Sequence, residues 1–75
     1  MRKRSIAIAG HRTSIALEIQ FWDALARIAS ADGRSLPDIV ADIDSERLKA
    51  SPPPGLASAL RVYVLERASA DRRQS

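Results

Sequence analysis

Length, composition and charge set narrow limits on what this chain can be. It has 75 residues, 45% of them hydrophobic and 28% charged, which is the balance of one small globular domain rather than of a disordered chain. A chain of this size closes only a marginal core by itself, so we expect a partner subunit to complete it. Because it has no cysteine and a single histidine, we expect neither disulfides, nor a metal site, nor a cofactor. The short length also argues against an enzyme, because a substrate pocket is hard to enclose in so few residues.

The net charge of +3 is distributed unevenly along the chain. Residues 1–12 carry four basic residues and no acidic one, whereas residues 18–46 carry seven acidic residues and two basic ones. A basic end on an acidic body suits binding to a polyanion. The alternative is that Arg2-Lys3-Arg4 only keeps the terminus soluble. No apolar run approaches the ~18–20 residues that cross a bilayer, so we expect a cytoplasmic protein without membrane contact.

Two short segments near the N-terminus alternate apolar and small or polar residues with a period of two. Residues 5–9 and 13–17 therefore both read as strands with one apolar face, and Gly10-His11 between them is suited to a hairpin turn. The prediction is firmer for residues 13–17. Residues 5–9 are rich in alanine, so residues 1–11 are expected to form a basic N-terminal arm, with a short extra strand as the alternative. We expect no internal repeat in the chain.

From residue 19 onward the apolar spacing becomes helical. This first helix is expected to end at Asp32-Gly33, because glycine readily adopts the left-handed conformation that closes a helix. Ser35 then reads as the N-cap of a second helix, with Pro37 tolerated in its first turn. That helix is expected to fade by residues 46–50.

The C-terminal part is predicted to contain a proline-rich connector at 51–55, a third helix at 56–68 and a polar tail at 69–75. The third helix has a second apolar edge formed by Val62 and Leu65. In so small a protein, two apolar edges favour an interface with another chain. The segment before the connector, residues 12–50, is expected to form the core of the domain.

Residues capable of catalysis do not form a recognisable constellation. His11 lies in a turn among basic residues, and nothing places a carboxylate and a nucleophilic serine beside it. Asp42 and Asp44 are two positions apart on a helix and point to different sides. No glycine-rich phosphate-binding motif occurs. We therefore predict no catalytic residue.

The remaining signal is an order of elements: strand, helix, Gly-x-Ser turn, helix. It is carried by Arg12-Thr13-Ser14-Ile15-Ala16-Leu17, by Phe21-Trp22-Asp23-Ala24-Leu25 with Ile28-Ala29, by Gly33-Arg34-Ser35, and by Leu36, Ile39, Val40 and Ile43. With these residues the chain resembles the ribbon-helix-helix family, the Arc/MetJ/CopG type of bacterial DNA-binding dimer. The resemblance implies a mainly α fold with a short N-terminal β-ribbon, an intertwined homodimer and, here, an added third helix at the C-terminus.

The resemblance also implies a set of site residues. Outward side chains of the ribbon would read base edges in the major groove, while the basic arm and the start of the second helix would hold phosphates. Ala16 departs from the family, which commonly has a polar residue there. The expected residues are Arg12, Ser14 and Ala16 for base readout; Arg2, Lys3, Arg4, Arg34 and Ser35 for phosphate; and Ile15, Leu17, Trp22, Leu25, Ile39, Val40 and Ile43 for the dimer interface.

We therefore expect a small transcription regulator that inserts a two-stranded antiparallel ribbon into double-stranded DNA. The alternative is a protein-interaction module, antitoxin-like or regulatory, with little or no specific DNA binding. It gains weight if residues 5–9 pair with 13–17, because the dimer sheet then has four strands. The outer face of that sheet would carry small side chains that read bases poorly, namely Ser5, Ala7, Ala9, Ser14 and Ala16.

Overall fold

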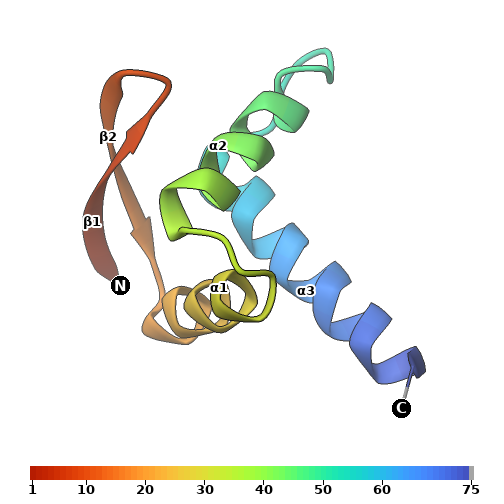
Figure 1. The fold of residues 1–75 in the computed structure, drawn as a ribbon. Coiled ribbons are helices and arrows are strands. Elements are labelled where there is room, and N and C mark those ends of the chain that lie inside the picture. The colour runs from red at the N-terminus through yellow and green to blue at the C-terminus, as the bar shows by residue number, and fades with distance from the viewer. Residues whose placement is uncertain (75) are drawn as a thin grey trace.

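The chain folds into a two-stranded antiparallel hairpin followed by three helices, and the computed structural model describes residues 1–74 (Figure 1). The hairpin lies along one side of the helices, and the last helix is the longest element. This mainly helical architecture with an N-terminal ribbon agrees with the predicted fold class. The elements are β1 (Arg2–Ile8), β2 (His11–Leu17), α1 (Ile19–Ala31), α2 (Leu36–Arg47) and α3 (Leu56–Gln74).

The first segment is a strand rather than a loose arm. β1 begins at Arg2, so the three basic residues at the N-terminus belong to it, and its whole length pairs with β2. The turn consists of Ala9-Gly10 and not of Gly10-His11 as predicted, since His11 already opens β2. Ala9 and Gly10 have φ values of 48° and 84°, the type I′ geometry whose twist matches that of a tight hairpin.

The ends of the first two helices lie where the local signals predict them. α1 stops before Asp32, and Gly33 follows in the left-handed region with φ 64°. The hydroxyl of Ser35 accepts a hydrogen bond of 3.2 Å from the backbone N–H of Asp38 and so caps α2. Pro37 lies in the first turn, where a missing N–H costs nothing.

The third helix is longer than predicted. α3 runs to Gln74, so residues 69–74 continue the helix instead of forming a polar tail. This stretch contains neither glycine nor proline, and alanine, arginine and glutamine are good helix formers. Arg67 and Asp71, one turn apart, add an ion pair of 3.5 Å. Polarity alone therefore misplaced the end of this helix.

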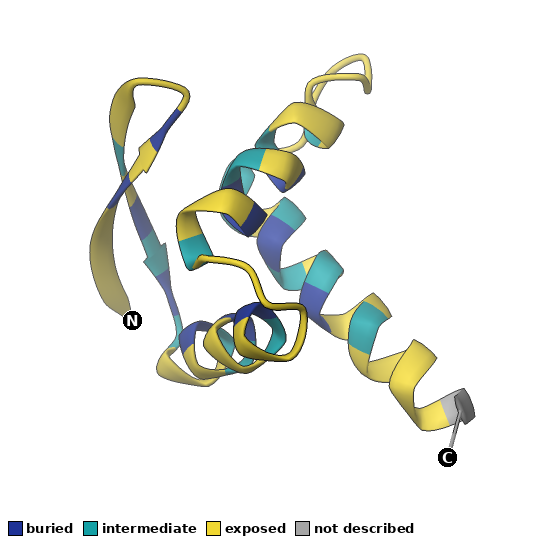
Figure 2. Cartoon of the chain, viewed as in Figure 1, coloured by how far each residue is buried: buried dark blue, intermediate teal, exposed yellow. Residues whose placement is uncertain are grey.

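The core lies between the inner face of the hairpin and the three helices (Figure 2). Leu17, Leu25 and Leu60, from β2, α1 and α3 respectively, have no exposed surface. Burial of this apolar surface is the main stabilising contribution to the fold. The arrangement leaves the opposite face of the hairpin in solvent. The buried residues are Ile6, Ile8, Ile15, Leu17, Trp22, Leu25, Ala29, Ile39, Val40, Ile43, Leu60 and Val64.

Candidate nucleic-acid interface

The register of the hairpin defines which side chains point away from the helices. Residues directly opposite each other in an antiparallel pair share a face, and Arg4 stands opposite the buried Ile15. The residues that alternate with these two point outward, and most of them are exposed. Arg12, Ser14 and Ala16 lie on this side, as the alternation predicts. The outer face consists of Lys3, Ser5, Ala7, Arg12, Ser14 and Ala16.

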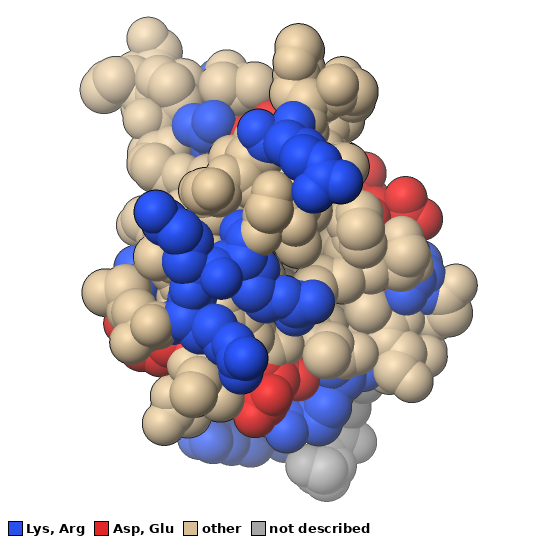
Figure 3. Space-filling view, turned by 90° about the vertical axis from the view of Figure 1, so that its left-hand side faces the viewer, with Lys and Arg blue, Asp and Glu red and all other residues tan. Residues whose placement is uncertain are grey.

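The outer face has a cation at each end. Lys3 stands opposite Ala16 at one end. Arg12 stands opposite Ala7 at the other end. Neither cation has a hydrogen-bond or ion-pair partner among residues 1–72, whose side chains the structure describes. Neither strand contains an acidic residue, and Figure 3 shows Lys and Arg side chains gathered on this side of the molecule. Unpaired donors on an acid-free surface are suited to phosphate oxygens and to the acceptor edges of bases.

The indole of Trp22 holds the basic strand against the helices. Its Nε1–H donates a hydrogen bond of 2.8 Å to the backbone carbonyl of Arg2. The guanidinium carbon of Arg4 lies 5.2 Å from the centroid of the same ring, in cation–π range. Arg2 and Arg4 therefore lie along the side of β1 that faces α1, next to the outer face rather than on it.

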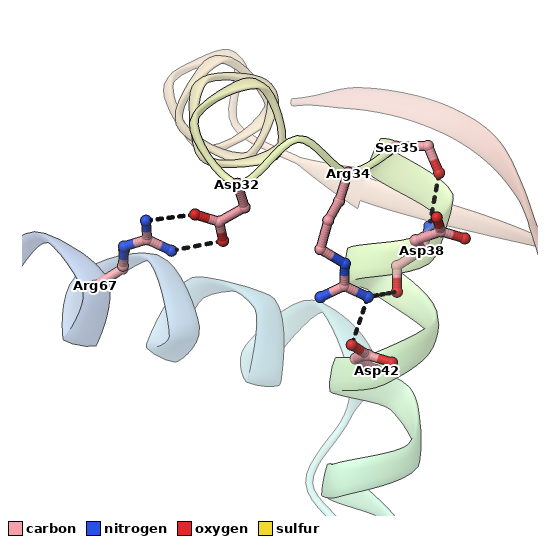
Figure 4. A network of polar contacts seen from close by, with 6 residues as sticks. All are labelled: Asp32, Arg34, Ser35, Asp38, Asp42 and Arg67. Atoms are coloured by element: carbon pink, nitrogen blue, oxygen red, sulfur yellow. Dashed lines mark hydrogen bonds and ion pairs between the residues drawn. The ribbon is translucent and has the colours of Figure 1, made fainter.

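The start of α2 is a second, separate polar site (Figure 4). The side chain of Arg34 points along α2. It donates a hydrogen bond of 3.2 Å to the backbone carbonyl of Asp38 and forms an ion pair with the carboxylate of Asp42. The hydrogen bond from Arg34 to Asp42 raises the pKa of Arg34. Ser35 is engaged as the cap, and Asp38 already supplies negative charge to the first turn. The structure thus places Arg34 and Ser35 beside carboxylates, apart from the cations of the hairpin.

The residues expected at a dimer interface are all covered within one chain. Leu17, Leu25 and Val40 are fully buried, and the most exposed of the set, Ile43, reaches only 8%. One chain therefore covers all seven side chains without a partner. The seven are Ile15, Leu17, Trp22, Leu25, Ile39, Val40 and Ile43.

Two ion pairs join α1 to α3, and the sequence gives no local sign of either. Arg61 donates to Glu18 at 2.9 and 3.1 Å across 43 positions, and these contacts lower the pKa of that carboxyl. The guanidinium of Arg67 donates two hydrogen bonds, of 2.9 and 2.7 Å, to the carboxylate of Asp32, 35 positions away in the sequence. These contacts lower the pKa of Asp32. Both pairs fix the helices behind the hairpin rather than contributing to the outer face.

The order of elements and the register together define a ribbon packed on helices, and the comparison with family models agrees. The model described as the ribbon-helix-helix domain matches residues 1–68. The chain therefore belongs to the ribbon-helix-helix domain family, whose members are in general DNA-binding transcription regulators or antitoxins.

Comparison with curated proteins and with solved structures identifies no relative. No curated protein and no solved structure is significantly similar to the chain. Across residues 1–74, no helix combines the length and the apolar character needed to cross a membrane.

Proposed function

We propose that this chain binds double-stranded DNA and acts as a small transcription regulator, with its hairpin lying in the major groove. The observation that carries the proposal is the outer face. Neither strand has an acidic residue, and Lys3 and Arg12 have no ion-pair or hydrogen-bond partner among the side chains that the structure describes. Membership of a family whose members are in general DNA-binding regulators or antitoxins supports the same reading.

The size of the hairpin suits the groove. Neighbouring strands lie ~4.8 Å apart, and the major groove is about 12 Å wide, so it admits two strands with their side chains. Arg12 offers two parallel donors that match guanine O6 and N7. Ser14 can donate or accept a hydrogen bond, and Ala16 offers a methyl contact to thymine. These three residues are the proposed readers of base edges.

Phosphate contacts are proposed for the basic residues beside the reading surface. Arg2, Lys3 and Arg4 follow one another on β1 and reach the backbone that flanks the groove. Ser35 and Arg34 form the second proposed phosphate site at the start of α2. Because Arg34 must first leave Asp42, we expect it to contribute less to affinity than the arginines of β1.

We propose that the active form is a homodimer, which is typical of ribbon-helix-helix domains. The seven residues first expected to meet a partner are already covered within the chain. The large apolar side chains that α3 leaves exposed in its described part are Val62 and Leu65, and we assign the contact between chains to them.

Fluorescence anisotropy tests the DNA-binding proposal. The purified protein is titrated onto a duplex from the region upstream of its own gene and onto a shuffled duplex of the same composition, at two salt concentrations. We expect preference for the native duplex and affinity that falls steeply with salt, because basic side chains release counterions from phosphate. Arg12→Ala should lower the preference by about 1–3 kcal/mol.

Arg27→Ala is the matched control for this experiment. Arg27 is an exposed arginine of α1 with no ion-pair partner among the described side chains of residues 1–72, and its removal changes the net charge by the same amount. It should leave the preference unchanged. Absence of binding to either duplex at low salt would contradict the proposal. An equal loss of preference in Arg12→Ala and Arg27→Ala would show that Arg12 contributes only positive charge and no base contact.

Two observations favour a second candidate function, binding of another protein. The first is the pairing of β1 with β2, which leaves small side chains over the middle of the outer face. The second is a groove between α2 and α3. It has a volume of about 560 Å³, and its lining combines apolar side chains, among them Ile39, Ile43 and Val62, with charged ones such as Arg34 and Asp42. Ser58 lies on its wall and is exposed. If the protein co-purifies from cells with a stoichiometric protein and without nucleic acid, and Ser58→Arg abolishes that association, this second function replaces the first.

A further inference from the structure

The groove between α2 and α3 is elongated, because it follows the axis of α3. The two helices pack side by side (Figure 1), and the lining residues of α3 include Ser58, Val62 and Glu66, which lie one turn apart. A second hollow, which Glu66 also borders, continues to Ala70. From Ser58 to Ala70 this surface is about 18 Å long at ~1.5 Å per residue, the length of a helix of about 12 residues. The shape therefore suits a helical segment rather than a compact small molecule.

The deepest part of the groove is apolar. Ile39 and Ile43 of α2 are buried, and Val62 of α3 is left exposed beside them. Removing such surface from water favours association. An apolar groove of this kind is where the apolar face of an amphipathic helix docks.

The two arginines that line the groove are already engaged within the chain. Arg34 forms its ion pair with Asp42 (Figure 4). Arg47 donates a hydrogen bond of 2.7 Å to the carboxylate of Asp44 and one of 3.0 Å to the backbone carbonyl of Pro54. Neither guanidinium is therefore available to hold an acidic ligand.

Carboxylates on both sides of the groove are open to an incoming cation. Glu66 of α3 has no hydrogen-bond or ion-pair partner among the side chains described for residues 1–72. Glu46 of α2 is bound by Lys49, at the exposed surface of its own helix, and a pair of this kind is weak. The groove thus combines an apolar floor with acidic sides, which is complementary to a ligand that is both apolar and basic.

We infer that this groove binds a basic amphipathic helix of another protein. The apolar face of that helix lies against Ile39, Ile43 and Val62, and a lysine or arginine on its flank pairs with Glu66. This inference rests on the second candidate function, the binding of another protein, and it names the chemistry of the partner. It does not depend on DNA binding, because the groove is lined by α2, α3 and the segments that flank α2.

A second copy of this chain is less complementary to the groove. The arginines that flank Val62 on α3 are Arg61 and Arg67, and they are engaged with Glu18 and Asp32. The α3 helix of a second copy would therefore bring apolar side chains but no free guanidinium from these two positions. Because Val62 also belongs to the proposed contact between chains, a bound helix and a second copy should compete for it.

Selection of displayed peptides tests the inference. Three libraries of helical peptides of about 14 residues share an apolar stripe at i, i+3, i+4 and i+7. The flanking positions are lysine and arginine in the first library, glutamate in the second and glutamine in the third. The wild-type protein should select binders from the basic library, and a synthetic copy of the best one should bind in fluorescence anisotropy. Light scattering of the complex should give the mass of one chain and one peptide.

Glu66→Lys tests the charge contact within the groove. It should weaken the binding of the selected peptide by about 5-fold or more, and one of the copies with a single lysine changed to glutamate should bind this variant more tightly. Asp23→Lys is the control, because Asp23 is an exposed carboxylate of α1 and its replacement changes the net charge by the same amount. Ser58→Arg should abolish binding, since its long side chain enters the groove. A circular dichroism spectrum that matches the wild type confirms that each variant is folded.

The outcomes separate this inference from the functions proposed above. Binders from the acidic or neutral library alone, lost in Ser58→Arg, would keep the groove as a protein-binding site and overturn the basic partner. Equal losses in Glu66→Lys and Asp23→Lys would overturn the contact with Glu66. If all three libraries fail, the inference and protein binding through this groove both fail, and a mass of two chains in that sample would identify a second copy as the occupant. DNA binding is measured separately and is decided by neither result.

Discussion

The carboxylate of Asp32 accepts two hydrogen bonds, of 2.7 and 2.9 Å, from the guanidinium of Arg67. Asp32 is the C-cap of α1, and Glu18, held in the same way by Arg61, is its N-cap. Both arginines belong to α3. Ion pairs therefore tie α1 to α3 at both ends of α1.

This arrangement predicts how stability depends on pH. The arginine contacts lower the pKa of Glu18 from its ordinary value of 4.5 and that of Asp32 from 3.8. Because the unfolded chain binds these protons more readily, the contribution to stability is complete above those ordinary values. It is lost as pH falls through the lowered values of the folded state. Thermal unfolding should therefore show a melting temperature that falls between neutral and strongly acidic pH.

The double variant Glu18→Gln, Asp32→Asn isolates this effect. It has no carboxylate to protonate at either end of α1, so its melting temperature should be lower at neutral pH and change less on acidification. Glu46→Gln is the control, because Glu46 pairs with Lys49 only at the exposed surface of a single helix turn. Parallel pH profiles for the wild type and the double variant would contradict the prediction.

Trp22→Phe should loosen the hairpin from the helices. The variant loses the 2.8 Å hydrogen bond to the carbonyl of Arg2 and leaves space in the core, which together cost about 1–3 kcal/mol. Arg4→Ala removes only the contact with the ring face and should cost less than about 1 kcal/mol. Urea unfolding followed by circular dichroism measures both. Equal losses would mean that the ring face, not the indole N–H, holds β1.

The elements that sequence signals could place are those governed by local chemistry. Gly33 and Ser35 mark the boundary between α1 and α2, because a left-handed residue and a capping hydroxyl act within a few positions of themselves. The inward direction of Ile15 and Leu17 follows equally from strand alternation. The outward-facing side of β2 was therefore predictable from the sequence.

Contacts between distant segments were not predictable in this way. Nothing near Asp32 indicates that its partner is Arg67, because only packing of α3 brings them together. The pairing of Ser5 with Ser14 likewise depends on the register of the hairpin, which composition does not determine. The ion pair of Arg34 with Asp42 was not predictable either, because it depends on the direction in which the Arg34 side chain extends along α2.

The hairpin turn offers a test of local strain. Ala9 adopts φ 48°, a left-handed conformation that costs an L-residue with a side chain ~1–2 kcal/mol. Ala9→Asn should therefore stabilise the protein by roughly 0.5–1 kcal/mol, since asparagine tolerates this region and Asn-Gly suits type I′ turns.

Gly10→Ala should have the opposite effect. A Cβ at Gly10 meets no atom within 4 Å, so the loss comes from its φ of 84° alone and should reach about 1 kcal/mol or more. Gly55→Ala is the control, because a Cβ there also meets nothing within 4 Å and its φ lies outside the left-handed region. Denaturant midpoints of the three variants check the order. An Ala9→Asn variant less stable than the wild type would show that the turn is not of this type in solution.

The exposed apolar side chains of α3 predict the state of assembly. Val62 and Leu65 are 49% and 60% exposed, and a second copy that covers them would remove both from water. Light scattering at micromolar concentration should give twice the chain mass of 8.2 kDa. Val62→Lys, Leu65→Lys should give a folded monomer, while Leu48→Lys, at an equally exposed leucine just after α2, should remain a dimer. A wild-type protein that scatters as a monomer would contradict the dimer, and a folded double variant that stays dimeric would place the contact away from α3.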